Sequence, residues 1–372
     1  MISDVSTSGK SIRAALALML VVACSSMLSA QDSAKNTSAS VDISGFVDSY
    51  YSLNFANPSS RVNRLRNFDI AENTINLSLA EVVFQKKASP VGFRLDVDYG
   101  TANDVVQGGV ASTTSIVQQA YLTFIVPVGS GLTIDAGKFV THMGYEVIES
   151  KDNWNYSRSL LFAWAIPYYH AGVRFGYTFS STFSATVHIV NGWNSVIDNN
   201  GAKSIGLQLS YTPSSTTSII FNTISGHENL TSIEYGARNV FDLIVTHQLS
   251  NVLSLGLNGD YGEARTYTGL MTWKGVAAYG RYAFSEKSAL ALRVEVFDDP
   301  EGYAIGIGSQ SNIKELTATY EYKFADALLL RGELRDDSSN LPVFDTKASS
   351  TSTGMGTEKS QLTLLVGAVV TF

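Results

Sequence analysis

The sequence predicts an all-β protein: a transmembrane antiparallel β-barrel of about 16 strands, with short periplasmic turns and long external loops. Three observations lead to this fold class. The carboxy-terminal segment alternates in character and ends on Phe372, the amino terminus has a secretory pattern, and many period-two segments are separated by alternately short and long connections. Inside a bilayer only helices and closed barrels satisfy all their backbone polar groups, so these strands must close on themselves.

The carboxy-terminal segment 361–372 alternates with a period of two residues. Successive side chains of a strand point to opposite faces, so one face of this segment is apolar: Leu362, Leu364, Val366, Ala368, Val370 and Phe372. A closed barrel pairs its last strand with its first, which removes the unpaired edge. We therefore expect Phe372 to end a lipid-facing strand and to be the residue through which the barrel-assembly machinery binds the chain.

The amino terminus has the pattern of a secretory signal peptide. Lys10 and Arg13 precede the apolar run 14–23, and small residues follow up to Ala30. This apolar core of about ten residues is half of what a membrane-spanning helix needs, so an anchoring helix is the weaker interpretation. We predict cleavage after Ala30, which assigns residues 1–30 to the signal peptide.

Cleavage there leaves a barrel domain, residues 31–372, that opens with a flexible segment, residues 31–40. The only cysteine of the chain is Cys24. It either leaves with the signal peptide or, in an alternative interpretation, belongs to a lipidation motif and becomes the first mature residue. If it leaves, the mature chain has no thiol for disulfides, metal binding or catalysis.

The composition fits an exported barrel better than a soluble globule. Charged residues make up 16% of the chain, against a norm of about 25%, while Gly, Tyr and Phe are plentiful. After the signal segment no apolar run approaches the length of a membrane-spanning helix, so the chain must cross as strands. The formal net charge of −7 argues against nucleic acid as a partner.

The clearest period-two segment is Val91–Tyr99. Its odd positions are apolar, whereas Arg94, Asp96 and Asp98 occupy the opposite face. The same alternation recurs in 290–296, 315–323 and 328–335. A soluble sandwich shows this pattern with its polar face outward, so the distinction depends on the two chain ends and on the connections.

One segment, 72–86, changes face along its length. Its apolar residues Ile75, Leu77 and Leu79 occupy odd positions, whereas Val82 and Phe84 occupy even positions. An extra residue in one strand shifts the alternation in this way, so we expect a β-bulge near Glu81.

The connections alternate between short turns and long polar stretches, as in outer-membrane barrels. The long stretches lie near 55–72, 101–115, 140–170, 192–203, 226–238, 262–271, 298–311 and 336–359. About eight external loops require an even strand number near 16, with both chain ends periplasmic. A barrel of that width should enclose water rather than packed side chains.

The longest internal loop, 140–170, follows the fifth predicted strand and is too apolar to remain in solvent. Five of its residues need burial: Leu160, Leu161, Phe162, Trp164 and Ile166. A long loop without structure of its own is usually functional. We expect it to fold into the barrel and narrow the pore; the alternative is that it packs on the rim or against a neighbouring subunit.

Charges at this loop and on the opposite wall are the candidate pore constriction. Glu146, Glu149, Asp152 and Arg158 lie on the loop, and the wall candidates are Arg94, Arg174, Arg281, Arg331 and Arg335. The alternative is that these charges form pairs that only stiffen the wall. Acidic lumen candidates are more numerous, which favours a mild cation preference: Asp42, Asp48, Asp96, Asp98, Asp135, Asp242, Asp260, Glu295, Glu321 and Glu333.

The sequence gives little sign of catalytic or metal chemistry. The histidines are scattered and lack the spacing of metal ligands: His142, His170, His188, His227 and His247. No nucleophile elbow or similar serine motif is present. We expect no enzymatic activity, no cofactor and no metal.

Four segments resemble the family of putative β-barrel porin-2 proteins, also called OmpL-like porins: Gly45–Tyr51, Gly137–Glu146, Asn153–Phe162 and Pro167–Arg174. The likeness covers essentially the whole mature chain and is strongest from 120 to 195. It implies an outer-membrane channel for small hydrophilic solutes, and it carries over no catalytic residues.

The sequence therefore predicts a bacterial outer-membrane porin for passive diffusion of small hydrophilic solutes and ions through a water-filled barrel narrowed by an inserted loop. The alternative is a structural or adhesive barrel with a plugged lumen, and a barrel hydrolase is the weakest interpretation. The expected partners are outer-membrane lipid, lipopolysaccharide, the barrel-assembly machinery and small solutes, and a homotrimer is compatible with this size.

Overall fold

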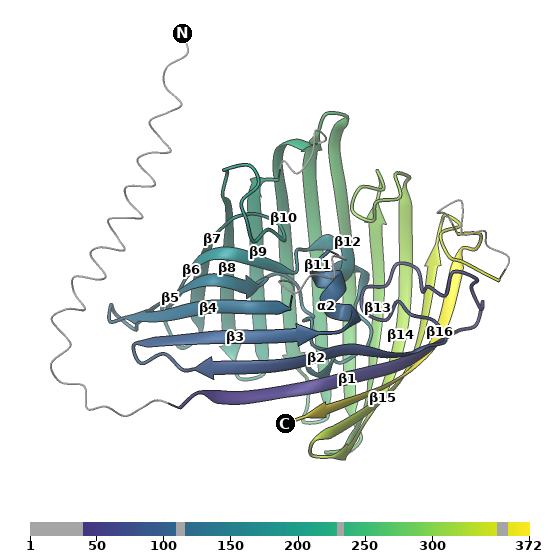
Figure 1. Ribbon diagram of the computed structural model, residues 1–372, viewed down its shortest axis with the longest axis horizontal. Coiled ribbons are helices and arrows are strands. Elements are labelled where there is room, and N and C mark those ends of the chain that lie inside the picture. The colour runs from purple at the N-terminus through teal and green to yellow at the C-terminus, as the bar shows by residue number, and fades with distance from the viewer. Residues whose placement is uncertain (1–39, 109–115, 229–233, 348–355) are drawn as a thin grey trace, which may run out of the picture. The chain divides into compact units, whose positions relative to one another are not determined.

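The computed structural model describes residues 40–108, 116–228, 234–347 and 356–372. In these residues 16 antiparallel strands form one closed barrel in which each strand pairs with its neighbours in the sequence and β16 pairs with β1 (Figure 1). This confirms the predicted fold class. The predicted signal peptide and residues 31–39 of the predicted flexible segment lie outside the described residues.

The strands are longest in the second half of the barrel. Their bounds are β1 (Asp42–Asn54), β2 (Ile75–Lys86), β3 (Val91–Tyr99), β4 (Val117–Val126), β5 (Leu132–Val140), β6 (Tyr169–Thr178), β7 (Phe183–Val190), β8 (Ser204–Ser214), β9 (Thr217–His227), β10 (Glu234–Gln248), β11 (Leu253–Thr266), β12 (Gly269–Ala283), β13 (Ser288–Asp299), β14 (Ser311–Ala325), β15 (Leu328–Ser339) and β16 (Ser360–Thr371). The loops hold three short helical segments, α2 (Thr101–Val106), η1 (Ser150–Asp152) and η2 (Leu161–Ala165). None of the helices in the described part of the chain is long and apolar enough to cross a membrane.

The last strand closes the barrel as its sequence predicts. β16 pairs with β1 in a continuous register from Phe46↔Thr371 to Asn54↔Thr363. At its end the backbone N–H of Phe372 donates to the carbonyl oxygen of Gly45 at 3.0 Å, and the reverse bond is 3.1 Å. Backbone groups that would otherwise form two open edges are therefore satisfied, which a strand in lipid requires.

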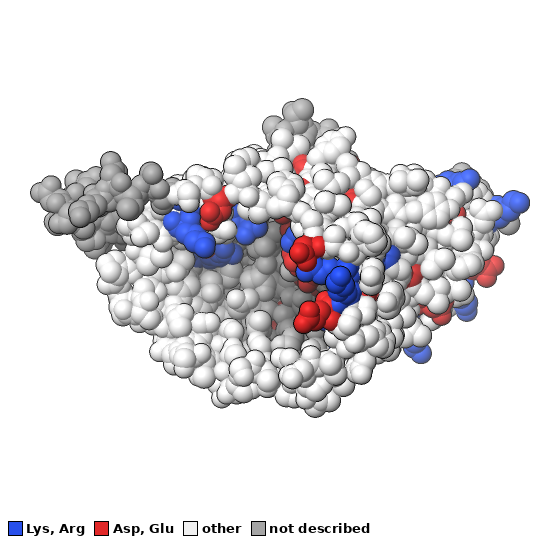
Figure 2. Space-filling view, turned by 90° about the horizontal axis from the view of Figure 1, so that it is seen from below, with Lys and Arg blue, Asp and Glu red and all other residues white. Residues whose placement is uncertain are grey.

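The strand faces separate lipid-like from polar side chains. On β3 the charged residues Asp96 and Asp98 are buried on the inside, whereas Val276, Leu292 and Val294 on β12 and β13 are exposed on the outside. Viewed from below, the curved outer wall is largely uncharged, and charged side chains gather around a hollow and at one edge (Figure 2). This distribution is the one a barrel in a bilayer needs.

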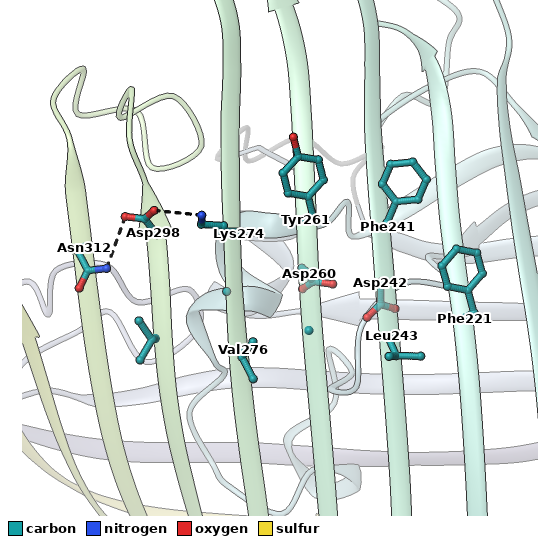
Figure 3. Close-up of a pocket in the computed structure, with 13 residues that line it drawn as sticks. Phe221, Phe241, Asp242, Leu243, Asp260, Tyr261, Lys274, Val276, Asp298 and Asn312 are labelled. Carbon is teal, nitrogen blue, oxygen red and sulfur yellow. Dashed lines mark hydrogen bonds and ion pairs between the residues drawn. The ribbon is translucent and has the colours of Figure 1, made fainter.

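The outer surface of β9–β13 carries a shallow apolar groove (Figure 3). Phe221, Phe241 and Val276 line it. At its margin the Lys274 ammonium lies 4.0 Å from the Asp298 carboxylate, which also accepts a hydrogen bond from Asn312 at 3.5 Å. The apolar side chains of the groove are followed by this charged pair, so the apolar band of the barrel ends here.

Strand β2 contains the predicted bulge, but the prediction of its position near Glu81 is wrong. The register against β1 jumps from Leu79 to Leu77 between Asp48 and Ser49, so Ser78 is the extra residue. Ser78 and Leu79 are consecutive and both buried, which is the local signature of a bulge.

Two of the predicted long loops are largely strand. β9 extends to His227 and β10 starts at Glu234, while β11 and β12 are joined by a two-residue turn at 267–268. A cross-strand network of polar side chains runs through these strand ends: Ser225 donates to Asn239 at 2.6 Å, and Asn239 donates to Glu263, in the predicted loop 262–271, at 2.9 Å. Side-chain hydrogen bonds of this kind let polar residues extend a ladder.

Candidate functional site

The connection between β5 and β6, residues 141–168, folds into the barrel; we call it the inserted loop. Near its start, its backbone meets inward-facing side chains of two strands: Gly144 N–H donates to Asp242 on β10 at 2.9 Å, and Tyr145 N–H donates to Asn258 on β11 at 3.3 Å. Further along, the Tyr156 hydroxyl donates to Asp48 on β1 at 2.7 Å. Since these partners lie on strands on different sides of the barrel, the loop crosses the lumen as predicted.

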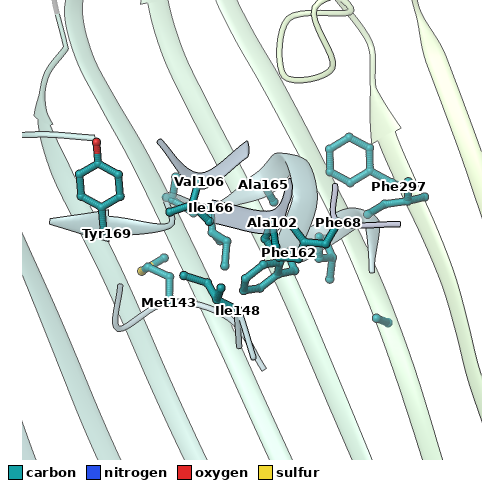
Figure 4. Close-up of a cluster of buried hydrophobic side chains, with 14 of the residues drawn as sticks. Phe68, Ala102, Val106, Met143, Ile148, Phe162, Ala165, Ile166, Tyr169 and Phe297 are labelled. Carbon is teal, nitrogen blue, oxygen red and sulfur yellow. The ribbon is translucent and has the colours of Figure 1, made fainter. Parts of the chain in front are cut away.

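An apolar cluster holds the inserted loop together inside the barrel (Figure 4). Leu160, Leu161 and Phe162 are at most 3% exposed. Phe68, from the connection between β1 and β2, packs against Phe162 with ring centroids 6.1 Å apart, and Ala102 of α2 joins the same cluster. Burial of such side chains is the main favourable term in packing, so three connections form one core within the lumen.

Two wall carboxylates bind the backbone of the inserted loop directly. Glu295 on β13 accepts the N–H groups of Leu160 and Leu161, both at 2.7 Å. Glu333 on β15 accepts those of Tyr156 at 2.7 Å and Ser157 at 3.0 Å. Hydrogen bonds from neutral donors to a carboxylate are stronger than neutral pairs. These residues were predicted as lumen charges, but they serve as anchors for the loop.

Arg293 is the centre of the buried ion-pair network between loop and wall. Its guanidinium lies 2.6 Å from Glu146 of the loop and 2.8 Å from Glu315 of β14, and its side chain is fully buried. It also donates to the carbonyl oxygen of Ser157 at 2.7 Å. Sequence reasoning missed this residue as a site candidate, although Arg293 faces the lumen in an alternating segment like Arg331.

A second set of wall arginines also reaches the loop. Arg331 donates to the carbonyl oxygens of Ser150 and Asn153, and Arg335 donates to that of Arg158 at 2.5 Å. Both arginines are at most 2% exposed and pair with carboxylates of the wall. Three carbonyl groups of the loop are therefore satisfied by cations, which reinforces its position.

The predicted constriction residues fall into two groups. Five of them are tied into the packing of the inserted loop: Glu146, Glu149, Arg158, Arg331 and Arg335. Arg158 donates to carbonyls within its own loop, and Glu149 accepts a bond from Gln118 at 2.8 Å. The predicted opposition of loop acids and wall arginines across open water is not present for these residues.

The other four line accessible parts of the lumen. The side chains of Arg94, Arg174 and Arg281 are 30%, 24% and 32% exposed, and that of Asp152 is 55% exposed. Each arginine pairs with a more deeply buried wall acid at 2.8 to 2.9 Å. Arg174 also lies over the ring of Tyr121, 5.1 Å from its centroid.

The tip of the inserted loop borders a cavity of about 470 Å³. Lys151 and Asp152 line it together with Glu81 and Arg94, and the β14–β15 turn and Phe372 place it toward the end of the barrel with the short turns. A second cavity of about 310 Å³ lies on the other side of the loop, between it and the long connections. The inserted loop therefore separates two vestibules.

Burial changes the titration of loop residues. Burial, and to a smaller extent the charge of nearby Asp152, raises the pKa of Glu149. Burial lowers the pKa of His142 to about 4, so its ring is neutral at neutral pH. Asp152 differs from these residues, because its side chain is 55% exposed and lines the cavity of about 470 Å³.

Three histidines that are scattered in the sequence meet in the structure. The ring of His142 stacks on that of His188 with centroids 4.0 Å apart, and His170 lies 5.7 Å away. Parallel stacked rings do not direct their nitrogens at one point. Accordingly, the described residues contain no group of three or more His, Cys, Asp or Glu side chains that could hold a metal ion.

A sequence model of the family described as "Putative beta-barrel porin-2, OmpL-like" matches residues 40–372. The chain belongs to this family. It is therefore an outer-membrane porin of bacteria, and its closed barrel with an inserted loop is the channel scaffold. No curated protein sequence matches this porin.

Solved structures of outer-membrane proteins share the fold of this porin at low identity. The anion-selective porin from Comamonas acidovorans is 12% identical with a TM-score of 0.62, over 90% of this chain and 99% of that one. The outer membrane channel DcaP of Acinetobacter baumannii is 12% identical with a TM-score of 0.60, over 91% and 99%. Outer-membrane expressed OmpT of Vibrio cholerae is 13% identical with a TM-score of 0.60, over 91% and 99%.

Proposed function

We propose that this porin lets small hydrophilic solutes and ions diffuse passively through the part of the lumen that the inserted loop leaves open. The observation that carries the proposal is the position of the loop, which is anchored on both sides of the barrel and lies between two vestibules. A pore narrowed by a fixed loop selects by size and by the charges that remain accessible there.

The accessible charges favour anions in this proposal. Three of the four accessible constriction candidates are basic, since Arg94, Arg174 and Arg281 expose a quarter to a third of their side chains. The one accessible acid, Asp152, pairs with the neighbouring Lys151 at 2.5 Å. Many of the acidic residues behind the predicted cation preference are occupied by the loop backbone or by ion pairs. A basic lining raises the local concentration of anions, so we propose a weak anion preference instead. The related fold from Comamonas acidovorans is described as anion-selective.

Substitution of Arg94 and Arg174 by glutamine is expected to shift selectivity toward cations. The change removes two accessible positive charges while their buried acidic partners stay. The measurement is the reversal potential of single channels in a planar bilayer under a salt gradient. The control is Lys314→Gln, because Lys314 is exposed on the outer face of β14. An unchanged reversal potential in the double variant would contradict the proposed lining.

A structural or adhesive barrel with a plugged lumen is the second candidate, and the apolar cluster inside the barrel favours it. The two functions differ in conductance. Discrete ohmic steps from the purified, correctly folded protein support a pore, and electrical silence supports a plug.

The remaining expectations are part of the same proposal. A homotrimer, contacts with lipid and lipopolysaccharide along the apolar outer wall, and binding of the assembly machinery through Phe372 are consistent with an outer-membrane barrel. Phe372 is 68% exposed at the end of β16, so it is available to a partner. Residues 1–30 stay a predicted signal peptide.

A further inference from the structure

The cavity of about 310 Å³ on the long-loop side of the inserted loop is unusually rich in aromatic residues. We call it the aromatic pocket; it is lined by Ala163, Trp164, Ile166, Tyr168, Trp193, Asn194, Arg238, Trp273, Tyr303 and Ala304. Trp164, Trp193 and Trp273 are three of the four tryptophans of the chain. Five separate segments contribute to it, so the concentration of rings does not come from one local sequence.

The pocket rings are held by specific contacts. The indole N–H of Trp273 donates to the carbonyl oxygen of Ala165 at 3.0 Å, and its ring stacks on Tyr303 with centroids 5.6 Å apart. The guanidinium of Arg238 lies 4.8 Å from the centre of the Trp193 ring and donates to the Tyr303 hydroxyl at 2.7 Å. A pocket whose walls are already fixed loses little entropy when it binds a ligand.

Passive diffusion through a pore gives no reason for these aromatic side chains to be exposed to water. Trp164, Tyr168, Trp193 and Tyr303 are all partly exposed, although they lie at the polar end of the barrel and not against lipid. Aromatic faces left in water forgo the free energy of burial. A ligand that covers them would recover it, while Arg238 and Asn194 supply polar groups beside the rings.

We propose that the aromatic pocket is a docking site for saccharides at the long-loop mouth of the porin. The faces of a pyranose ring present C–H groups that pack on aromatic rings, and its edge presents hydroxyls for polar groups such as Arg238. The volume lies at the lower end of the roughly 300–1,000 Å³ of small-molecule sites, which suits one or two sugar rings. The positive charge of Arg238 disfavours cationic ligands.

This inference rests on the proposed function, because a docking site at the mouth serves solutes that pass the loop. Docking brings a sugar to the edge of the inserted loop and raises its local concentration there. Binding can still be measured without conduction, so the two proposals fail separately.

The test is a titration of the purified protein in detergent with maltose, followed by tryptophan fluorescence. Three of four tryptophans line the pocket, so we expect a saturable change in emission. Trp193→Ala and, in an independent element, Tyr303→Ala should each raise the dissociation constant about tenfold, as expected for the loss of one anchor ring. Heat-modifiable migration in electrophoresis verifies that each variant is folded.

Trp154→Phe is the matched control. Trp154 belongs to the inserted loop but packs on Tyr145, with ring centroids 5.8 Å apart, and does not line the pocket. This variant should keep the wild-type affinity for maltose. The proposal is overturned if maltose leaves the emission of the wild type unchanged, or if the Trp154 variant loses binding while both pocket variants keep it.

Discussion

Replacing Glu295 and Glu333 together by alanine is expected to release the inserted loop and to raise single-channel conductance. The two carboxylates accept four backbone N–H groups between Tyr156 and Leu161 at 2.7 to 3.0 Å. Hydrogen bonds to charged groups contribute about 1.5–3 kcal/mol each. Their joint loss leaves buried N–H groups without acceptors, so the packed position of the loop loses its advantage over a displaced one.

The control for this prediction is Asp135→Asn. Asp135 is a lumen acid that pairs with Arg174 at 2.8 Å and accepts a bond from Thr123 at 2.6 Å, both on the wall. Its substitution should leave the size of the conductance steps close to that of the wild type. If the Glu295 and Glu333 double variant also gave wild-type steps, the loop would not be held by these bonds or would not limit the current.

Replacing Arg293 by methionine is expected to destabilise the folded barrel severely. Methionine fills part of the space of the arginine stem, but it leaves the buried Glu146 carboxylate without its ion-pair partner and leaves Glu315 with only the more distant Arg335, 4.0 Å away. Breaking a buried ion pair in this way costs about 3–5 kcal/mol. We expect a clearly lower denaturant midpoint, measured by the loss of heat-modifiable migration of the folded form.

The control variant is Arg281→Met, which removes a lumen arginine without breaking the buried ion pairs of Arg293. Arg281 is 32% exposed and pairs with Glu321 at 2.9 Å. A partly exposed pair contributes at most about 1 kcal/mol, so the midpoint should move little. Equal midpoints for the Arg293 and Arg281 variants would show that the buried network does not stabilise the barrel.

The barrel could be predicted from the sequence because the membrane requires apolar residues at every second position of each strand. Apolar and polar residues alternate in segments such as Val91–Tyr99, and a closed sheet is the structure that satisfies such strands in lipid. The bulge was misplaced by three residues because alternation shows that a face changes but not where the extra residue lies. Strands that extend beyond the apolar band have polar sequences like those of loops, which is why 262–271 was predicted as a loop.

The candidate site was less predictable because its geometry depends on the path of one long loop. Leu160, Leu161 and Phe162 indicated that the loop is buried. No pattern showed that Glu295 and Glu333 would bind its backbone while Glu321 would pair with arginines, since all three occupy equivalent inward positions. Contacts between residues distant in sequence are fixed by tertiary packing, not by local alternation.

The histidine cluster illustrates the same limit. His170 and His188 face the lumen from the adjacent strands β6 and β7, whose register places His188 beside Arg174. His142 joins them only because the inserted loop starts by turning inward, where its ring lies 3.1 Å from the carbonyl oxygen of Thr223. Spacing along the chain contains no sign of this contact.

The most direct test of the central claim, that the inserted loop bounds the conducting path, is thiol labelling of Asp152→Cys during single-channel recording, in a Cys24→Ser background. The Asp152 side chain is 55% exposed at the tip of the loop and lines the cavity of about 470 Å³ at the short-turn end of the barrel. A charged methanethiosulfonate reagent should reduce the current in discrete steps, while Ser150→Cys, at a position 1% exposed, should not react. Wild-type current after complete labelling of Asp152→Cys would contradict the account.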